Sequence, residues 1–366
     1  GLVEKVDENY VHNIATAERT GGFVEPQIMT QWFVNVNKEW KGHTLKEMMR
    51  ETVESGKIKI IPDYFNKTYF HWIDNLRDWC ISRQIWYGHR IPVWYRNDEI
   101  SCDIEAPKGD GWEQDSDTLD TWFSSALWTF STLGWPENTP DLKIYHPTNV
   151  LETGYEILFF WVARMIMMTG FCLEDIPFHT VYLHGTVRDD KGRKMSKSLN
   201  NGIDPLDVAK DFGMDAGRMA LVVGNTVGTD MKMSRDKIKA YKNFANKIWN
   251  IARYVLSQEN PPADGGELKK DLIEEFDNLA KDITRDMESF RFYIAAEKIY
   301  AYVWHRFADE ILEESKNKEG YGETLFYILE NSLKLLHPFM PFITEEIWQS
   351  MNKKNLLMIE PWPTKQ

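Results

Sequence analysis

The spacing of hydrophobic residues changes twice along this chain of 366 residues. In the first part, short alternating runs predict strands between 22 and 36, and an apolar run at 58–62 predicts a strand ended by proline. Hydrophobic residues three and four apart predict helices over 45–55 and 70–82, the second of them amphipathic. The polar stretch 97–116, which contains Gly and Pro, is interpreted as an exposed insertion loop.

The middle of the chain alternates short apolar strands with a long apolar helix. A run at 149–152 predicts a parallel strand, and Gly154 follows it at the turn into the helix. A second strand is predicted at 181–185. This order of strand, turn and helix is typical of a parallel sheet that binds nucleotides at the carboxyl ends of its strands. The most apolar stretch, 157–168, is interrupted by Arg164, so we expect a buried helix and no membrane span.

Beyond residue 204 nearly every periodic segment has helical spacing. A long helix is predicted from 232, with an apolar stripe that begins at Ile238 and ends at Val255. The other predicted helices cover 205–212, 216–222, 268–287, 292–314, 324–336 and 343–351. We therefore expect an α/β domain followed by an all-α helical bundle.

Charge is distributed unevenly along the chain. The formal net charge of -13 at pH 7 argues against a non-specific nucleic-acid binder. Between 231 and 254, however, Lys and Arg dominate and Asp236 is the single acidic residue. The candidate phosphate contacts in this segment are Arg235, Lys239, Lys242 and Lys247. The alternative is a solvated helix face whose cations balance acidic neighbours.

Cysteine usage points away from disulfides and metals. Only Cys80, Cys102 and Cys172 occur, without a Cys-x-x-Cys pair or a His/Cys cluster at zinc-ligand spacing. We therefore expect neither a disulfide framework nor a structural zinc site, and a reducing cytoplasm suits this composition. The first residues, GLVEKVDENY, do not resemble a signal peptide.

A basic loop follows the predicted strand that ends in His184 and Gly185. Its four cations are Lys191, Arg193, Lys194 and Lys197. Such a cluster needs an anionic partner, and the glycines and serines of the loop suit a phosphate group. A solvent-exposed basic hairpin is the alternative for any short charge run. The string from Lys194 to Ser198 reads KMSKS, which is far more specific than its charge alone.

This string, placed after a strand that ends in His-Gly, resembles the signature loop of class I aminoacyl-tRNA synthetases. Three further segments resemble the valyl-tRNA synthetase branch of that class: DWCISRQIWYGHRIPVWY at 78–95, LDTWFSSALWTFSTLGWP at 119–136 and TGYEILFFWVARMIMM at 153–168. The isoleucine and leucine branches share the R-x-W-x-I-S-R-Q pattern at 77–84, so an isoleucyl-type synthetase is the nearest alternative. The segment HPFMPFITEEIWQ at 337–349 resembles the anticodon-binding domain of this branch.

The resemblance implies an ATP site and an amino-acid pocket. The residues expected at ATP are Gly154, Glu156, His184, Gly185, Lys194, Met195, Ser196, Lys197 and Ser198. Lys194 and Lys197 are the expected catalytic cations, because charge builds on the leaving oxygens when a carboxylate attacks the α-phosphorus of ATP, bound with Mg²⁺. Most relatives have Asp where this chain has Glu156. Trp122, Ile157 and Trp161 are expected to enclose valine, and valine tRNA is the expected macromolecular partner.

The same resemblance implies an order of domains. Residues 1–40 correspond to the tail of the editing-domain insertion and the return to the catalytic domain. Residues 41–204 correspond to the C-terminal half of a Rossmann-like catalytic domain, 205–231 to a connecting helical region and 232–366 to the anticodon-binding bundle.

The other signature of the class, a His-x-Gly-His turn after the first strand, does not occur in this sequence. The first half of the sheet and the contacts for the valine ammonium group would accompany it. We therefore expect part of a synthetase that is inactive or incomplete alone, either a truncated piece or one subunit with a separate N-terminal half as partner. A non-catalytic tRNA-binding module is the alternative from another class, and the intact KMSKS string, Trp122 and Trp161 argue against it.

Overall fold

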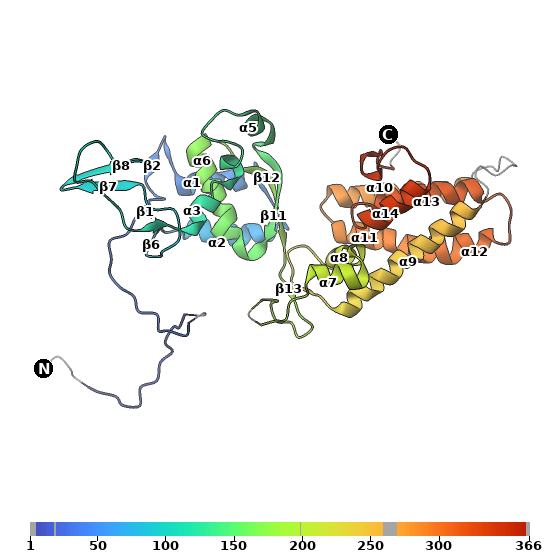
Figure 1. The fold of residues 1–366 in the computed structure, drawn as a ribbon, viewed down its shortest axis with the longest axis horizontal. Coiled ribbons are helices and arrows are strands. Elements are labelled where there is room, and N and C mark those ends of the chain that lie inside the picture. The colour runs from blue at the N-terminus through green and yellow to red at the C-terminus, as the bar shows by residue number, and fades with distance from the viewer. Residues whose placement is uncertain (1–4, 18–19, 198, 259–268, 364–366) are drawn as a thin grey trace. The chain divides into compact units, whose positions relative to one another are not determined.

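The computed structural model describes residues 5–17, 20–197, 199–258 and 269–363 of the chain. The chain divides into two compact units. The first comprises Gly1–Glu39 and Leu76–Ser124, and the second comprises Trp40–Asn75 and Ser125–Gln366. Figure 1 shows that strands dominate the first unit, whereas the second contains a parallel sheet and most of the helices.

The first unit is held together by short antiparallel pairs. Strand β1 (Phe33–Val34) pairs with β5 (Trp79–Cys80), and β6 (Ser82–Arg83) pairs with β10 (Thr118–Leu119). Of the strands predicted between 22 and 36, β1 is observed. At the start of that predicted region, Phe23 makes only an isolated bridge.

The predicted loop at 97–116 is partly wrong, because it contributes two strands to a small sheet. The order of that sheet is β8 (Glu99–Cys102), β7 (Val93–Arg96) and β9 (Glu113–Gln114), all antiparallel. Asp115, next to β9, accepts hydrogen bonds from Trp32 Nε1 at 2.8 Å and from the Tyr95 hydroxyl at 2.7 Å. Polar residues beside a partly buried acceptor can form strands, which a polarity pattern alone does not reveal.

The predicted helix at 70–82 is also wrong in extent. Helix α2 spans Phe65–Asp74, and β5 begins five residues later. Two long-range bonds favour the extended form of 78–80: Asp78 accepts from the Val36 amide, and Trp79 Nε1 donates 2.9 Å to the Asp120 carboxylate. Both partners are distant in sequence, so the helical spacing of the apolar residues is overridden by tertiary pairing.

The second unit contains the predicted parallel sheet, which is confirmed. Its order is β11 (Thr148–Gly154), β12 (Phe178–His184) and β4 (Lys59–Ile61), with β12 in the centre. Burial explains this central position, because Phe178, Val181 and Leu183 are fully buried. A buried parallel strand is expected to be apolar on both faces.

Helices surround this sheet. Helix α1 (Leu45–Glu54) agrees with the predicted 45–55 and begins at a capping box, in which Thr44 and Glu47 satisfy each other's backbone amides. From Gly154 the chain passes through the 3₁₀ turn η1 (Tyr155–Ile157) and the π-helical segment η2 (Leu158–Ala163) into helix α6 (Arg164–Leu173).

This continuous helical stretch, Tyr155–Leu173, is long and apolar enough to span a membrane by length and composition alone. Half of it is buried inside the second unit, with Leu158, Val162 and Met165 inaccessible to solvent. A core helix passes the same test of length and composition, so this feature is weak evidence for a membrane span.

The helical part follows the predicted boundaries closely. Helices α7 (Pro205–Phe212) and α8 (Met214–Val222) precede the long α9 (Arg235–Ser257). On α9 the ends of the predicted apolar stripe, Ile238 and Val255, are buried. This confirms a helix with one face in a core.

The remaining helices complete the predicted bundle. They are α10 (Lys270–Glu288), α11 (Phe292–Ala301), the π-helical η3 (Tyr302–Ile311), α12 (Leu312–Ser315), α13 (Gly322–Leu336) and α14 (Pro341–Ser350). Residue 268, the predicted start of the first of them, lies outside the described residues. Phe244, Phe276, Phe307 and Trp348 fill one core shared by these helices and α9.

Candidate nucleotide site at the basic loop

The basic loop begins where the parallel sheet ends. After β12, strand β13 (Val187–Arg188) pairs in parallel with β14 (Met231–Lys232), and Arg188 forms an isolated antiparallel bridge with Lys194. The Met195 amide donates to the Val187 carbonyl at 3.2 Å. At the tip, Gly192 has a φ of +78°, which suits glycine in the tight turn between these two stretches. The KMSKS string therefore starts from a defined backbone position.

Asp189 organises the turn, and the sequence reasoning missed it. Its buried carboxylate accepts from the backbone amides of Lys191 and Arg193 and from the side chains of Arg193 and Asn201. The hydrogen bond from Asn201, followed by those from Arg193, lowers the pKa of Asp189 far below its usual range. An Asp two to three residues before a glycine turn was the available sequence signal. Arg193 thus stabilises the loop itself, and the candidate phosphate ligands of the KMSKS string are Lys194 and Lys197.

The residues of the KMSKS string after Lys194 make different contacts. The Ser196 amide donates to the Asn201 side chain at 2.9 Å, and the Met195 side chain packs against the apolar cluster around Val208 and Ile238. Lys197 is exposed. Ser198, the last residue of the string, lies outside the described residues.

Lys194 is bound to Glu156, another residue expected at ATP. Its ammonium nitrogen lies 2.8 and 3.1 Å from the two carboxylate oxygens of Glu156. Glu156 belongs to the 3₁₀ turn that follows β11, whereas Lys194 lies 38 residues later in the loop. The structure therefore joins two predicted ATP contacts directly.

The remaining predicted ATP contacts cluster at the carboxyl edge of the sheet. Gly154 and His184 are register partners at the ends of β11 and β12. The His184 ring lies 3.2 Å from Glu152 through Nε2, and its Nδ1 lies 2.8 Å from the Gly185 carbonyl. A side chain at Gly185 would collide with the backbone of Thr229, 1.8 Å from the position of an added Cβ. This close approach requires glycine at that position.

A second carboxylate, Asp230, was also missed and ties this edge together. It accepts from the Tyr155 hydroxyl at 2.9 Å, from the Thr186 amide at 2.8 Å and from Arg188 Nε at 2.6 Å. Burial raises the pKa of Asp230, but these hydrogen bonds outweigh burial and hold it below its usual value. Asp230 lies 44 residues from Thr186, so no local pattern could have identified it.

The residues predicted to contact the amino acid are described separately for each unit. In the second unit, Ile157 and Trp161 lie one helical turn apart, and Trp161 Nε1 donates to the Ser125 carbonyl at 2.9 Å. The Trp161 ring also lies 5.9 Å from the ring of Trp128. In the first unit, Trp122 lies in the short helix α3 (Thr121–Ser125), with its amide near Asp120.

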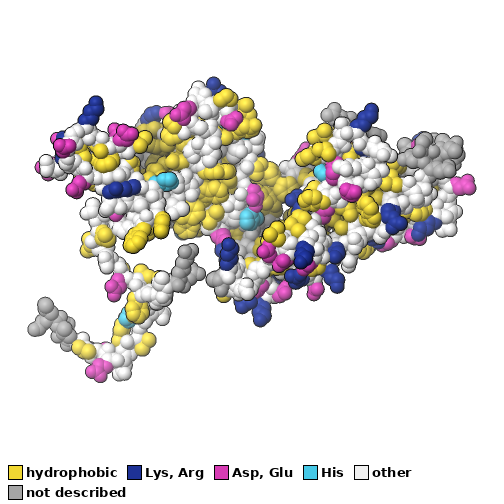
Figure 2. Space-filling model, in the orientation of Figure 1, with side chains coloured by type: hydrophobic (Ala, Val, Ile, Leu, Met, Phe, Trp, Pro, Cys, Tyr) yellow, Lys and Arg dark blue, Asp and Glu magenta, His cyan; other side chains and the backbone are white. Residues whose placement is uncertain are grey.

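The predicted phosphate-contacting cations on α9 differ in how free they are. Arg235 pairs with Asp211, and Lys242 donates 2.8 Å to the backbone carbonyl of the same residue. Lys247 is paired with Asp309 and lies over the Trp304 ring, with its side chain only 23% exposed. Lys239 is exposed. In Figure 2 the Lys and Arg side chains near α7 to α9 are interspersed with Asp and Glu, as these pairs require.

The described residues contain no group of three or more His, Cys, Asp or Glu side chains that could hold a metal ion. Cys80, Cys102 and Cys172 are free thiols.

Comparison with known families assigns this arrangement to a class. The model for tRNA synthetases class I (I, L, M and V) matches residues 4–109 and 100–234, and the anticodon-binding domain of tRNA ligase matches residues 269–366. The chain therefore belongs to the class I aminoacyl-tRNA synthetases.

Within that class, the chain is homologous to valine–tRNA ligases along its whole length. It is 44% identical to the ligase of Clostridium acetobutylicum over 392 residues, covering 100% of this chain and 44% of that protein. It is also 44% identical to the ligase of Geobacillus kaustophilus over 385 residues, covering 99% of this chain and 43% of that protein. The chain thus spans less than half the length of these relatives.

Solved structures show the same fold at lower sequence identity. A Mycobacterium tuberculosis methionyl-tRNA synthetase bound by methionyl-adenylate superposes with a TM-score of 0.70 at 19% identity, covering 94% of this chain and 67% of that one. A ternary LeuRS–tRNA–LeuAMS complex from Agrobacterium radiobacter K84 gives 0.68 at 23% identity, covering 80% and 44%. The mixed α/β and helical architecture is therefore a class I synthetase fold.

Proposed function

We propose that this chain supplies the KMSKS half of the active site and the anticodon-binding bundle of a valine–tRNA ligase. Such an enzyme activates valine with ATP and transfers it to valine tRNA. The observation that carries the proposal is the KMSKS string on a loop that leaves the carboxyl edge of a parallel sheet, in a chain homologous throughout to valine–tRNA ligases.

The three-stranded sheet supports a finer interpretation of the fold as the second half of a Rossmann-like domain. Strands β11 and β12 end side by side at Gly154 and His184, where ligands of open parallel sheets bind. We place the adenosine of ATP at this edge, with Gly154, Glu156, His184 and Gly185 as its contacts. The proposed domains remain 1–40, 41–204, 205–231 and 232–366.

In the proposed reaction, a valine carboxylate oxygen attacks the α-phosphorus of ATP and pyrophosphate leaves. Lys194 and Lys197 would neutralise the negative charge that develops on the leaving oxygens, with Met195, Ser196 and Ser198 forming the rest of the phosphate loop. Mg²⁺ would accompany ATP as part of the substrate. A loop that neutralises charge needs no nucleophile of its own, since positioning and electrostatics supply most of such a barrier reduction.

The observed pair between Lys194 and Glu156 supports a defined ligand-free arrangement. Before ATP binds, the two charges neutralise each other at 2.8 Å. We propose that the ribose hydroxyls take over Glu156, which releases Lys194 for the phosphates. Because both side chains are about half exposed, the pair is weak enough for a substrate to replace it.

Specificity for valine would come from an apolar slot made by Trp122, Ile157 and Trp161. Binding of valine tRNA would use the bundle together with the exposed cations Lys239 and Lys242 and, beside them, Arg235. Lys247 was predicted from the sequence to contact tRNA. Its ion pair with Asp309 argues against that contact.

A cytoplasmic location is proposed on the same homology and on the three free thiols.

Valine-dependent ATP–pyrophosphate exchange tests the function. The chain would be combined with an N-terminal synthetase half that carries His-x-Gly-His, and exchange would be measured with valine, isoleucine, leucine and methionine. We expect exchange with valine only in the combined sample. Preference for isoleucine would replace the proposal by the isoleucyl-type alternative, and tRNA binding without any exchange would favour a non-catalytic module.

A further inference from the structure

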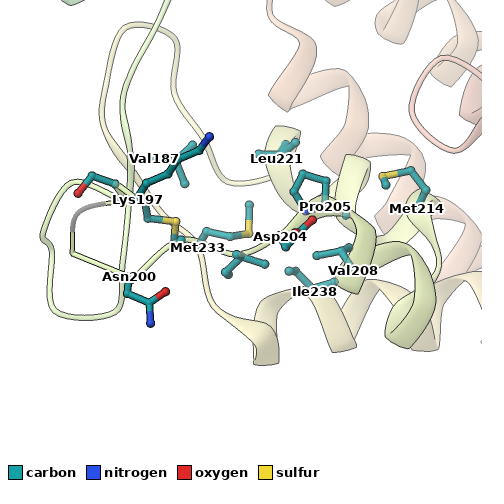
Figure 3. Close-up of a pocket in the computed structure, with 15 residues that line it drawn as sticks. Val187, Lys197, Asn200, Asp204, Pro205, Val208, Met214, Leu221, Met233 and Ile238 are labelled. Atoms are coloured by element: carbon teal, nitrogen blue, oxygen red, sulfur yellow. The ribbon is translucent and has the colours of Figure 1, made fainter.

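A cavity of about 630 Å³ lies between the KMSKS loop and the helices α7, α8 and α9 (Figure 3). Apolar side chains from all of these elements line it, including Val187, Met195, Val208, Leu221 and Ile238. Its volume falls within the range of about 300 to 1,000 Å³ that is usual for small-molecule sites. None of these apolar residues belongs to the proposed valine slot.

The floor of the cavity is rigid. Val208, Met233 and Ile238 are all less than a tenth exposed and belong to one packed cluster. The cavity is open to solvent on one side, but its floor is held by contacts that do not involve a ligand. The apolar part of a ligand that enters the cavity would be removed from water without any deformation of the helices.

The rim of the cavity is polar and favours an anion. Ser196, Lys197 and Asn200 contribute to it from the loop, as Figure 3 shows for Lys197 and Asn200. Among the described residues, no carboxylate lies within ion-pair distance of the Lys197 ammonium group. The one carboxylate of the lining, Asp204, accepts from the Leu206 amide and caps the N-terminus of α7. That charge is already complemented by the positive end of the helix.

From this arrangement we propose a second ligand site, which binds a small organic anion with an apolar body. The body occupies the cavity, and the acidic group is bound by Lys197 with hydrogen bonds from the loop. Since Met195, Ser196 and Lys197 form one wall, an occupied cavity holds the loop in the observed conformation and keeps Lys197 from the phosphates of ATP. This last consequence, inhibition of adenylate formation, rests on the proposed function, whereas binding itself does not.

Fluorescence titration of the full chain with 8-anilinonaphthalene-1-sulfonate tests the site. This probe combines an apolar body with one sulfonate. We expect one saturable site of unit stoichiometry. Leu221 lines the cavity and is 46% exposed, so it tolerates a charge. Leu221→Glu should weaken binding at least tenfold by repelling the sulfonate, whereas Leu221→Lys should preserve or strengthen it.

The matched control is Leu356→Glu, at a leucine that is 51% exposed and does not line the cavity. It should leave the affinity unchanged. Equal loss of binding in Leu221→Glu and Leu221→Lys, or equal affinity in all variants, would overturn the proposal.

Limited trypsin digestion gives a second readout that needs no enzymatic activity. In the parent chain, saturating probe should slow cleavage after Arg193 and Lys194 severalfold, because both residues belong to the loop that forms the cavity wall. In Leu221→Glu the same probe concentration should give no protection. Unchanged cleavage in the parent at full occupancy would refute the link between cavity and loop. Failure of valine-dependent exchange would leave both of these results intact.

Discussion

The Lys194 ammonium group is bound to the Glu156 carboxylate. Its proposed role at the phosphates of ATP therefore requires that it exchange this carboxylate for a phosphate group. The cations of the loop are not equivalent. Arg193 is bonded to Asp189, Lys194 to Glu156, and Lys197 is exposed. Lys194 and Lys197, the two lysines of the KMSKS string, are able to reach a substrate without breaking the turn that supports the loop.

Replacing both Lys194 and Lys197 by Ala should slow adenylate formation by roughly 10²-fold or more in the assembled enzyme. Each cation stabilises charge that exists mainly in the transition state, and loss of such a contact costs a few kcal/mol. The measurement is ATP–pyrophosphate exchange at saturating ATP. Lys191→Ala is the matched control, since Lys191 lies in the same loop and contacts Asp189 only through its amide. Exchange within threefold of the parent would remove the two lysines from the phosphate site.

Glu156→Gln should separate binding from chemistry. A carboxylate that accepts from the ribose acts equally on bound ATP and on the transition state, so its loss is expected mainly in KM. We expect the KM for ATP to rise about tenfold, as a hydrogen bond to a charged group implies, with kcat within about threefold. Steady-state exchange at varied ATP measures both. A fall in kcat at constant KM would instead place Glu156 at the reacting phosphate.

At the scale of elements, helix α9 decides how the bundle meets a nucleic acid. Its exposed Lys239 and Lys242 differ from Lys247, which is paired with Asp309 and packed on Trp304. The hydrogen bond from Lys247 also lowers the pKa of Asp309. Position on one helix therefore does not guarantee a common role.

The double variant Lys239→Gln and Lys242→Gln should weaken binding of valine tRNA and reduce the log–log salt slope by about 2, one for each lost phosphate contact. Lys247→Gln should leave the slope unchanged, because its ammonium group is bound within the protein. Titrations at four or more salt concentrations measure the slopes. An unaltered slope in the double variant would make these lysines ordinary solvated residues, and a change in Lys247→Gln would restore it as a tRNA contact.

The sequence predicted the elements whose stabilising contacts are local or periodic. Helix α1, with its capping box, the long α9 and the apolar strand β12 agree with their predicted positions. It did not predict strand β5, because its partners Asp120 and Phe33 are distant along the chain. The candidate site divides in the same way. The KMSKS string could be found from the sequence, and Asp189 has a local signal before the glycine turn, but Asp230 is recognisable only once folding has brought its donors together.

At the scale of the whole molecule, the three residues that we propose to contact valine are divided between the two units of the chain. Ile157 and Trp161 belong to the second unit, and Trp122 belongs to the first. Substrate selection in the proposed enzyme is therefore tested on the full chain, which contains all three residues. The chain spans 44% of the length of a related valine–tRNA ligase.

The last prediction concerns the proposed valine slot and the editing domain that would remove threonyl-tRNA. A slot made by Trp122, Ile157 and Trp161 would exclude isoleucine by overpacking, but an apolar slot cannot strongly reject threonine, which is similar in shape to valine. Valyl-tRNA synthetase is itself the reference case for this limit, with about 10²-fold discrimination against threonine, a known magnitude that we adopt. We propose that residues 1–40 correspond to the tail of an editing domain. An assembly of this chain with a catalytic half that lacks that domain should therefore release threonyl-tRNA uncorrected.

Aminoacylation of valine tRNA with labelled valine, threonine and isoleucine measures this outcome. In the same assembly, Ile157→Ala should admit isoleucine, since removing three methyl or methylene groups from the wall leaves room for the one extra methylene of that substrate. Adding an N-terminal half that contains an editing domain is the control, and it should remove threonyl-tRNA while leaving valyl-tRNA. Rapid hydrolysis of threonyl-tRNA without that domain would mean that its boundary relative to residues 1–40 is wrong. Unchanged exclusion of isoleucine in Ile157→Ala would show that Ile157 does not form the wall of the slot.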